Sequence, residues 1–451
     1  MKKRFSSRAR SLSILLAAAC VQSCTPSRTI GRMAGRDLLQ APELHAAQAG
    51  ISIYDPTAST YLFNYQADKY FIPASNTKLF TTYAGLKYLG DSLVGIRYQE
   101  SDTALFLAPS GDPSLLHPAY VSQPVIDFLQ HARKPVYLSD ANWKDRPLGR
   151  GWAWDDYNDD YAAERSPLPV YGNTIRWVQE KQKTTATDET FESTPSFYSI
   201  PEVDWPVRFT TDSGSRSFSV QRERNANVFH ITEGKEKYKA QDVPFITDGA
   251  ASAAILLKDT VGRSIALVHR SFPKSALRII HSRPVDSLFK PMLYHSDNFF
   301  AEQTLLMASN ERLGIMSDAR IIDTLLKTDL AGLPQRPFWV DGSGLSRNDL
   351  FTPQDFVWLL DKMSSEFGLV RMKALLPTGG AGTLSGYYKQ DSGAIFAKTG
   401  TLSGVVALSG YLITQKNRLL IFSILVNNYT GTASAIRRKI EKFVQALRAK
   451  Y

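Results

Sequence analysis

Strand-like segments stand at both ends of this 451-residue chain, and they constrain its fold more than any other feature. Near the start, Ile51–Tyr54 and Thr60–Asn64 flank a turn-rich stretch and predict a β-hairpin. Near the end, the apolar runs Val405–Ile413 and Arg418–Val426 predict a second hairpin, and a further strand is expected at Ala394–Lys398. Helical patterns lie between the two hairpins, so both fit one antiparallel sheet built from the two ends of the chain.

The helical patterns complete an α+β fold. Helices are expected after Ser75 and at Asp248–Lys258, Val285–Tyr294 and Phe299–Ser309. The chain closes on an amphipathic helix, whose apolar stripe consists of Ile436, Ile440, Phe443, Val444 and Leu447. The antiparallel sheet would therefore be flanked by helices.

Residues 91–244 differ in character from the rest of the chain. Prolines are frequent there, short alternating runs such as Val207–Thr210 predict strands, and the polar run Glu180–Thr194 predicts an exposed loop. We therefore expect a discontinuous α+β domain, formed by residues 45–90 and 245–451, with a β-rich insertion at 91–244.

The first 24 residues predict an export signal, because a basic segment precedes a short apolar run, Leu12–Val21. That run is too short to span a bilayer as a stable helix. Val21–Cys24 resembles the lipobox of bacterial lipoproteins, and Ala18–Cys20 is a second candidate. We expect export to the periplasm or cell envelope, lipidation of Cys24 and a tether over residues 25–44. A plain cleaved signal with incidental cysteines is the alternative.

Composition argues against several classes of partner. The net charge is +10, but five of the basic residues lie in the first 24 positions, which contain no acid, so the rest carries +5. We find no clustered basic stripe with interleaved aromatic residues, which disfavours nucleic-acid binding. The seven histidines show no metal-binding spacing. We expect no cofactor and no metal site.

Ser75 and Lys78 form an S-x-x-K tetrad at the start of a predicted helix. Residues three apart share one helix face, so a lysine amine can reach the serine hydroxyl and activate it as a nucleophile. Taken alone the pattern is common, and a solvated helix start is the alternative.

Two more polar motifs follow in the chain. Ser296-Asp297-Asn298 lies between two predicted helices, where its short side chains can point into a cleft or cap a helix. Lys398-Thr399-Gly400-Thr401 ends a predicted strand, and its alternative interpretation is an edge turn in which Gly400 supplies backbone freedom.

In this order, the three motifs are the signature set of serine penicillin-recognising enzymes. The segments Arg150–Asp156, Asp341–Arg347 and Ala397–Leu402 sharpen the resemblance. The chain resembles the low-molecular-mass class C penicillin-binding proteins, the D-alanyl-D-alanine carboxypeptidase/endopeptidases, from about residue 45 to 450. The resemblance implies a β-lactamase/transpeptidase-like catalytic domain.

The resemblance and the chemistry of the side chains assign the same catalytic roles. Ser75 would attack the carbonyl of the penultimate D-alanine and form an acyl-enzyme. Lys78 would act as the base, with its pKa lowered by repulsion from Lys398. Ser296 would relay a proton to the leaving amine.

The remaining motif residues would bind the substrate. Lys398 and the hydroxyls of Thr399 and Thr401 would hold its terminal carboxylate, beside Gly400, and Asn298 would bond the acyl-side amide. The backbone N–H groups of Ser75 and Thr401 would form the oxyanion hole.

The resemblance also points to Trp152 and Asp155. In that family, an acidic residue near this Trp-x-Trp segment contacts the free amine of the stem peptide's diamino acid. Inter-domain packing by the tryptophans, with Asp155 or Asp156 capping a turn, is the alternative.

We therefore expect a serine D-Ala-D-Ala carboxypeptidase and DD-endopeptidase. Its partners would be peptidoglycan stem peptides ending in D-Ala-D-Ala and β-lactam antibiotics, and it would meet the membrane only through a lipid anchor. One alternative is a β-lactamase, although we identify no base for its deacylating water beyond Lys78. Another is a non-catalytic, lipid-anchored wall-binding or sensor protein.

Overall fold

The computed structural model describes residues 25–451 except 182, 187–188, 193–194 and 211–216. The chain forms two compact units. Unit 1 comprises the chain up to Asn76 together with Leu333–Pro337 and Leu350–Tyr451, and unit 2 comprises Thr77–Gly332 and Phe338–Asp349. The chain passes from one unit to the other between Asn76 and Thr77, inside the S-x-x-K tetrad.

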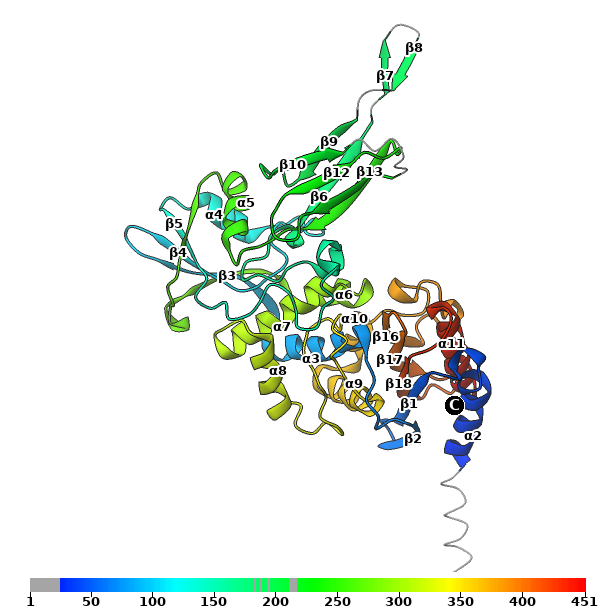
Figure 1. Cartoon of the computed structure of the whole chain (residues 1–451). Coiled ribbons are helices and arrows are strands. Elements are labelled where there is room, and N and C mark those ends of the chain that lie inside the picture. The colour runs from blue at the N-terminus through cyan, green and yellow to red at the C-terminus, as the bar shows by residue number, and fades with distance from the viewer. Residues whose placement is uncertain (1–24, 182, 187–188, 193–194, 211–216) are drawn as a thin grey trace, which may run out of the picture. The chain divides into compact units, whose positions relative to one another are not determined.

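Unit 1 contains the sheet that was predicted from both ends of the chain. Its five strands are all antiparallel and follow the order β16-β17-β18-β1-β2 (Figure 1). Their bounds are Ile395–Leu402, Val405–Ile413, Leu419–Asn427, Gln48–Asp55 and Thr60–Tyr65. The central strand β18 pairs with β1, so the two predicted hairpins meet there. The predicted single sheet and the α+β class are confirmed.

Helices cover both faces of this sheet. On one face, the predicted stripe of α11 (Ala433–Lys450) is buried against alternate residues of β18, including Phe422 and Ile424. On the other face, α9 (Pro353–Phe367) packs along β18 and β1 and is followed by α10 (Leu369–Leu375). Because both faces are covered, almost all of β18 is buried, and the edge strand β16 is held on a rigid scaffold.

The segment expected as a tether is instead folded. Helix α2 (Thr25–Ala34), a π-helical turn (Gly35–Leu39) and a 3₁₀ turn (Pro42–Leu44) replace it, and α2 lies beside α11 (Figure 1). Ile30, Ala34 and Leu38 are fully buried in the unit 1 core. Their spacing of four residues is helical, and the basic residues between them obscured this stripe in the sequence.

Unit 2 contains the helices that precede and follow the second motif. They are α3 (Lys78–Tyr88), α6 (Asp286–Tyr294), α7 (Asn298–Leu313) and α8 (Asp318–Lys327). Gly85 lets α3 approach its neighbours closely, since a Cβ atom there would lie 2.6 Å from the Phe289 ring and 2.9 Å from Thr304 of α7. Lys78 begins α3 and Asn298 begins α7, so this packing brings the two motif residues together.

The rest of unit 2 is rich in strands and extends past the predicted insertion. One five-stranded sheet has the order β14-β5-β4-β3-β15, and two three-stranded sheets have the orders β13-β6-β9 and β10-β12-β11. In the first sheet, β14 (Ile265–Val268) pairs with β5 (Val136–Ser139), and β15 (Arg278–Pro284) pairs with β3 (Ser92–Glu100). Strand pairing therefore crosses residue 244, and the predicted domain boundaries stay a prediction.

The other elements of this region have the following bounds. They are β4 (Leu105–Pro109), α4 (Pro124–His131), β6 (Thr174–Glu180), β9 (Ser196–Ile200), β10 (Val207–Thr210), β11 (Ser219–Arg222), β12 (Phe229–Thr232), β13 (Tyr238–Pro244) and α5 (Ala251–Val261). Within the run expected as a loop, β7 (Lys183–Ala186) pairs with β8 (Glu189–Glu192).

Predictions for the start of the chain fall outside the described residues. These are the export signal and the lipidation of Cys24. Among the described helices, none is both long enough and apolar enough to cross a bilayer.

The folded N-terminal segment yields a stability test. We expect Leu38→Ala to lower the free energy of unfolding by about 2–4 kcal/mol, because it leaves a cavity in the core. Arg32→Ala, which removes an exposed side chain of α2, should change it by less than about 0.5 kcal/mol. Urea unfolding followed by circular dichroism measures both, and equal values for the two variants would contradict a packed segment.

Candidate active site

In unit 1, Ser75 lies against the strand that carries the third motif. A Cβ atom added to Gly400 would lie 2.6 Å from Pro73 O and 3.1 Å from Ser75 N. Only glycine permits this approach, so Gly400 sets the distance between Ser75 and β16. Asn76 Nδ2 also donates to Ser409 Oγ of β17 at 2.7 Å, which fixes the tetrad to the sheet.

Alternation along β16 divides the third motif between two sides. Lys398 belongs to the same side as Gly400, which faces Ser75, and its buried Nζ donates to Thr399 O at 2.7 Å. Thr399 and Thr401 belong to the opposite side, where Thr401 Oγ1 accepts a hydrogen bond from Arg437 of α11. The structure therefore brings Ser75 and the predicted Lys398–Thr401 segment together.

In unit 2, Lys78 is fully buried and hydrogen-bonded. Its Nζ donates to Asn298 Oδ1 at 2.7 Å and to Ser343 O at 2.8 Å. The lysine of the first motif and the asparagine of the second, 220 residues apart, thus share a direct bond.

Burial lowers the pKa of Lys78 to about 8, and the carboxylates of Asp341, Asp297 and Glu302 oppose this shift. The lowered pKa agrees in direction with the prediction, and its largest cause is removal of the amine from water. The predicted repulsion from Lys398, which lies in the other unit, stays a prediction. A pKa of about 8 leaves roughly a tenth of the amine neutral at pH 7. Lys78 can therefore accept a proton at ordinary pH.

The Ser296-Asp297-Asn298 turn serves structure and chemistry together. Asp297 Oδ1 accepts from Phe300 N at 2.8 Å and caps α7, as the structural alternative proposed. The cap places Asn298 in the first turn, next to Lys78. Ser296 occupies the sharp turn between α6 and α7 with a φ of 61°.

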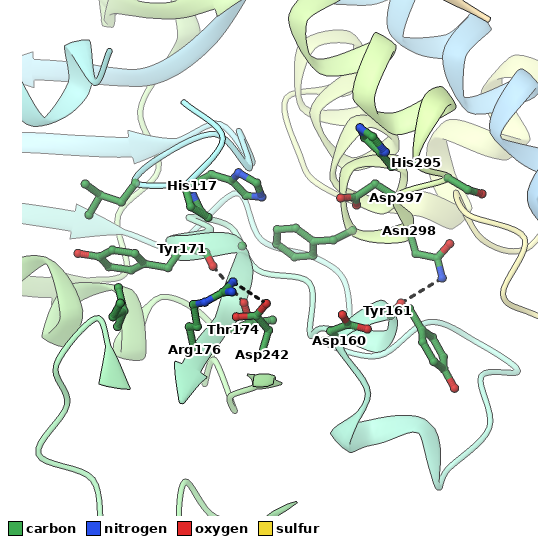
Figure 2. Close-up of a pocket in the computed structure, with 16 residues that line it drawn as sticks. His117, Asp160, Tyr161, Tyr171, Thr174, Arg176, Asp242, His295, Asp297 and Asn298 are labelled. Atoms are coloured by element: carbon green, nitrogen blue, oxygen red, sulfur yellow. Dashed lines mark hydrogen bonds and ion pairs between the residues drawn. The ribbon is translucent and has the colours of Figure 1, made fainter. Parts of the chain in front are cut away.

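This turn forms one wall of a cavity of about 580 Å³ (Figure 2). Asn298 Nδ2 donates to Tyr161 O at 3.1 Å, and the Arg176–Asp242 ion pair lines another wall. The cavity therefore offers polar and charged groups beside Ser296 and Asn298.

A loop that sequence reasoning left without a role holds Lys78. Asp341 organises it, since Oδ1 accepts from Gly344 N and Oδ2 from Ser346 N, each at 2.7 Å. This fold directs Ser343 O at Lys78. The signal in the sequence was Gly342, where an added Cβ would lie 2.8 Å from Ala301 O of α7.

Arg165 supports that loop through a buried ion network. Its guanidinium bonds Asp145 at 2.9 Å, Glu302 at 3.3 Å and Asp318 at 2.6 Å. Burial and the neighbouring Asp341 raise the pKa of Glu302, and Arg165 opposes them. Glu302 Oε1 in turn accepts from Ser343 N at 2.7 Å. These partners lie far apart in the chain, so no local pattern marks them.

The structure gives Trp152 a structural contact, because its Nε1 donates to Asp341 Oδ2 at 3.0 Å. Asp155 is exposed and makes no side-chain capping bond at the following 3₁₀ turn. Its neighbour Asp156 instead accepts a bond from Tyr161 OH at 3.1 Å. The same hydroxyl also donates to Asp159 at 2.9 Å, so both Asp156 and Asp159 are connected to Asn298 through Tyr161.

The two units carry complementary chemistry. Unit 1 holds a serine hydroxyl beside a cationic strand, and unit 2 holds a buried amine that can act as a base. The chain itself links them, because only two residues separate Ser75 from Lys78. These groups suit acyl transfer through a serine nucleophile.

Comparison with protein families gives an independent result. Residues 35–450 match the model of the D-Ala-D-Ala carboxypeptidase 3 (S13) family. The chain is 27% identical over 444 residues to a D-alanyl-D-alanine carboxypeptidase of Actinomadura sp. (strain R39), covering 88% of this chain and 80% of that one.

Solved structures agree with the fold. The chain is similar to penicillin binding protein 4 of Haemophilus influenzae with a TM-score of 0.71 and 19% identity, over 93% of this chain and 98% of that one. A predatory peptidoglycan endopeptidase of Bdellovibrio bacteriovorus matches with a TM-score of 0.52 and 13% identity, over 89% and 92%.

The ion network can be tested by stability. We expect Arg165→Met to cost about 3–5 kcal/mol, because it leaves the carboxylates of Asp145, Glu302 and Asp318 together without a cation. The matched variant Arg176→Met breaks a partly exposed pair and should cost less than about 1 kcal/mol. The loss at Arg165 should shrink as pH falls, since protonation relieves the repulsion. Thermal unfolding at several pH values measures this, and a loss independent of pH would contradict the charge argument.

Proposed function

Because this chain belongs to the D-Ala-D-Ala carboxypeptidase 3 (S13) family, and is a serine-type D-Ala-D-Ala carboxypeptidase, we propose that Ser75 is its acylated serine. The observation that carries this proposal is Lys78, a buried amine with a pKa of about 8 that lies three residues after Ser75 in the chain. Such an amine can remove the proton of a serine hydroxyl.

The hydrogen bonds of Lys78 favour its action as the base. A neutral amine has two N–H bonds, and Asn298 Oδ1 and Ser343 O are placed to accept both. The lone pair then serves to take the Ser75 proton as Oγ attacks the carbonyl of the penultimate D-alanine. Ser296 relays that proton to the leaving amine, completing the acyl-enzyme.

The substrate is bound by the other motif residues in this proposal. Because β16 is an edge strand, a peptide that lies along its edge can reach side chains on both sides of the strand. The terminal carboxylate then meets Lys398, Thr399 and Thr401, and the acyl-side amide meets Asn298. The backbone N–H groups of Ser75 and Thr401 stabilise the oxyanion, and such a donor typically contributes about 10²–10³ in rate. The small distance at Gly400 supports this assignment, because a side chain there would push Ser75 away from the strand.

Peptidoglycan stem peptides ending in D-Ala-D-Ala are the substrates that the family name supports. In this proposal the enzyme also cleaves peptide cross-links as an endopeptidase, and β-lactams acylate it. The resemblance assigns the free amine of the diamino acid to Asp155, with Trp152 beside it. The exposure of Asp155 supports this assignment, because its carboxylate is accessible to such an ammonium.

Export and lipidation of Cys24 complete the proposal, since the substrate lies outside the cytoplasmic membrane. Mass spectrometry of the protein purified from membranes tests it. A diacylglyceryl mass on Cys24 supports the anchor, and an unmodified mature N-terminus at another residue contradicts it.

The test of the acylated serine is labelling with a fluorescent penicillin. We expect wild-type protein to be labelled and Ser75→Ala to lose labelling and D-alanine release together, because the nucleophile is gone. Ser385→Ala, a substitution outside the three motifs, is the control and should retain both. Labelling of Ser75→Ala at the wild-type rate would contradict the assignment, and rapid turnover of a chromogenic cephalosporin would favour the β-lactamase alternative.

The role of Lys78 predicts a pH profile. Its neutral fraction grows as pH rises through the pKa, so the acylation rate should rise up to about pH 8 and level off above it. Asn298→Asp places a carboxylate beside Nζ, stabilises the charged form and should move the midpoint upward by about one unit or more. Stopped-flow labelling across this range measures both, and an unchanged midpoint in Asn298→Asp would exclude Lys78 as the titrating group.

A further inference from the structure

One cation beside the third motif belongs to none of the motifs. Arg437 lies on α11, between Ile436 and Ile440, whose burial in the unit 1 core fixes the orientation of this part of the helix. Its Nη2 donates to Thr401 Oγ1. Thr399 and Arg437 also line the same small cavity. Arg437 therefore faces the side of β16 that presents both threonine hydroxyls.

Arg437 differs from its neighbour Arg438 in its ion pairing. Arg438 pairs with Glu441 at 2.6 Å. Among the residues that the structure describes, no carboxylate forms an ion pair with Arg437. Its guanidinium contacts the Thr401 hydroxyl and the side chain of Tyr387, which it meets through a hydrogen bond and with the ring centroid 5.9 Å away. A partly exposed guanidinium that bonds a threonine hydroxyl and has no carboxylate partner is suited to receiving a carboxylate from a ligand.

We propose that Arg437 binds the C-terminal carboxylate of the substrate, together with the hydroxyls of Thr399 and Thr401. This inference rests on the proposed function of the site. A guanidinium presents parallel N–H donors that match the two carboxylate oxygens, which an ammonium such as that of Lys398 cannot do. Arg437 is therefore a specificity-determining residue for peptides with a free terminal carboxylate.

The bond to Thr401 also orients that hydroxyl. A hydroxyl that accepts from Arg437 keeps its own hydrogen for donation. The ligand carboxylate can then accept from Thr401 and from the guanidinium at once, so both donors converge on one anion. An uncharged C-terminus beside Arg437 would shield the guanidinium from water without supplying a counter-charge, which is unfavourable.

The experiment compares two substrates and three variants. An N-acylated peptide ending in D-Ala-D-Ala is used as the free acid and as its C-terminal amide. Arg437→Ala should lower kcat/KM for the acid by about 10- to 100-fold, the loss of a charge-assisted hydrogen bond, and change that for the amide by less than about threefold. Arg437→Lys, which keeps the charge without the fork, should recover part of the loss.

Arg438→Ala is the matched control, because it removes the same side chain from the next position of α11. It should leave kcat/KM for the acid within about twofold of wild type. Thermal unfolding of each variant separates a folding defect from a binding defect, since only the latter distinguishes acid from amide.

Equal losses on acid and amide for Arg437→Ala, or no loss on either, would overturn the inference. Failure of the proposed function gives a different result, because wild-type protein would then release no D-alanine from the acid. If wild-type protein is active and Arg437→Ala cleaves the acid equally well, only the role of Arg437 is overturned.

Discussion

Burial of the Lys78 amine is the constraint on which the rest of the site depends. Removing an ammonium from water is costly, so burial favours the neutral base and lowers its pKa to about 8. Asn298 Oδ1 and Ser343 O satisfy the buried amine, and each needs its own support. The Asp297 cap orients Asn298, whereas Asp341 and Glu302 shape the loop of Ser343. Much of unit 2 around α3 and α7 thus positions the two groups that bond the Lys78 amine.

The acidic residues around Lys78 oppose the effect of burial on its pKa. Asp341, Asp297 and Glu302 raise the pKa of Lys78, and without restraint they would hold the amine in its charged form. Burial raises the pKa of Asp297 and of Glu302, which weakens their negative charge. Arg165 neutralises Glu302 further through their ion pair. The network keeps the base poised between its two protonation states, which is what proton transfer near neutral pH requires.

The elements that could be predicted from the sequence are those marked by a local pattern. Apolar runs of strand length, separated by polar turns, predicted the strands of the unit 1 sheet, and helical spacing predicted α7 and α11. The three motifs named the residues that the structure groups at Ser75 and at Lys78. Reasoning failed where contacts join distant residues, as for Ser343 O or Arg165, and where basic residues obscured the stripe of α2. It did not give the burial of Lys78, because burial is a property of the fold.

The boundary between the two units clarifies how the tetrad is controlled. Ser75 and Asn76 are held by the sheet through Gly400 and Ser409, whereas Lys78 is held within unit 2. The positions of the nucleophile and the base are therefore fixed by different packing contacts, although the two residues are close in the chain. A change at Gly400 displaces the hydroxyl while the surroundings of the amine remain, and a change at Asn298 alters the amine while the strand remains. Because only two residues lie between Ser75 and Lys78, the two side chains can still take part in one acyl-transfer reaction.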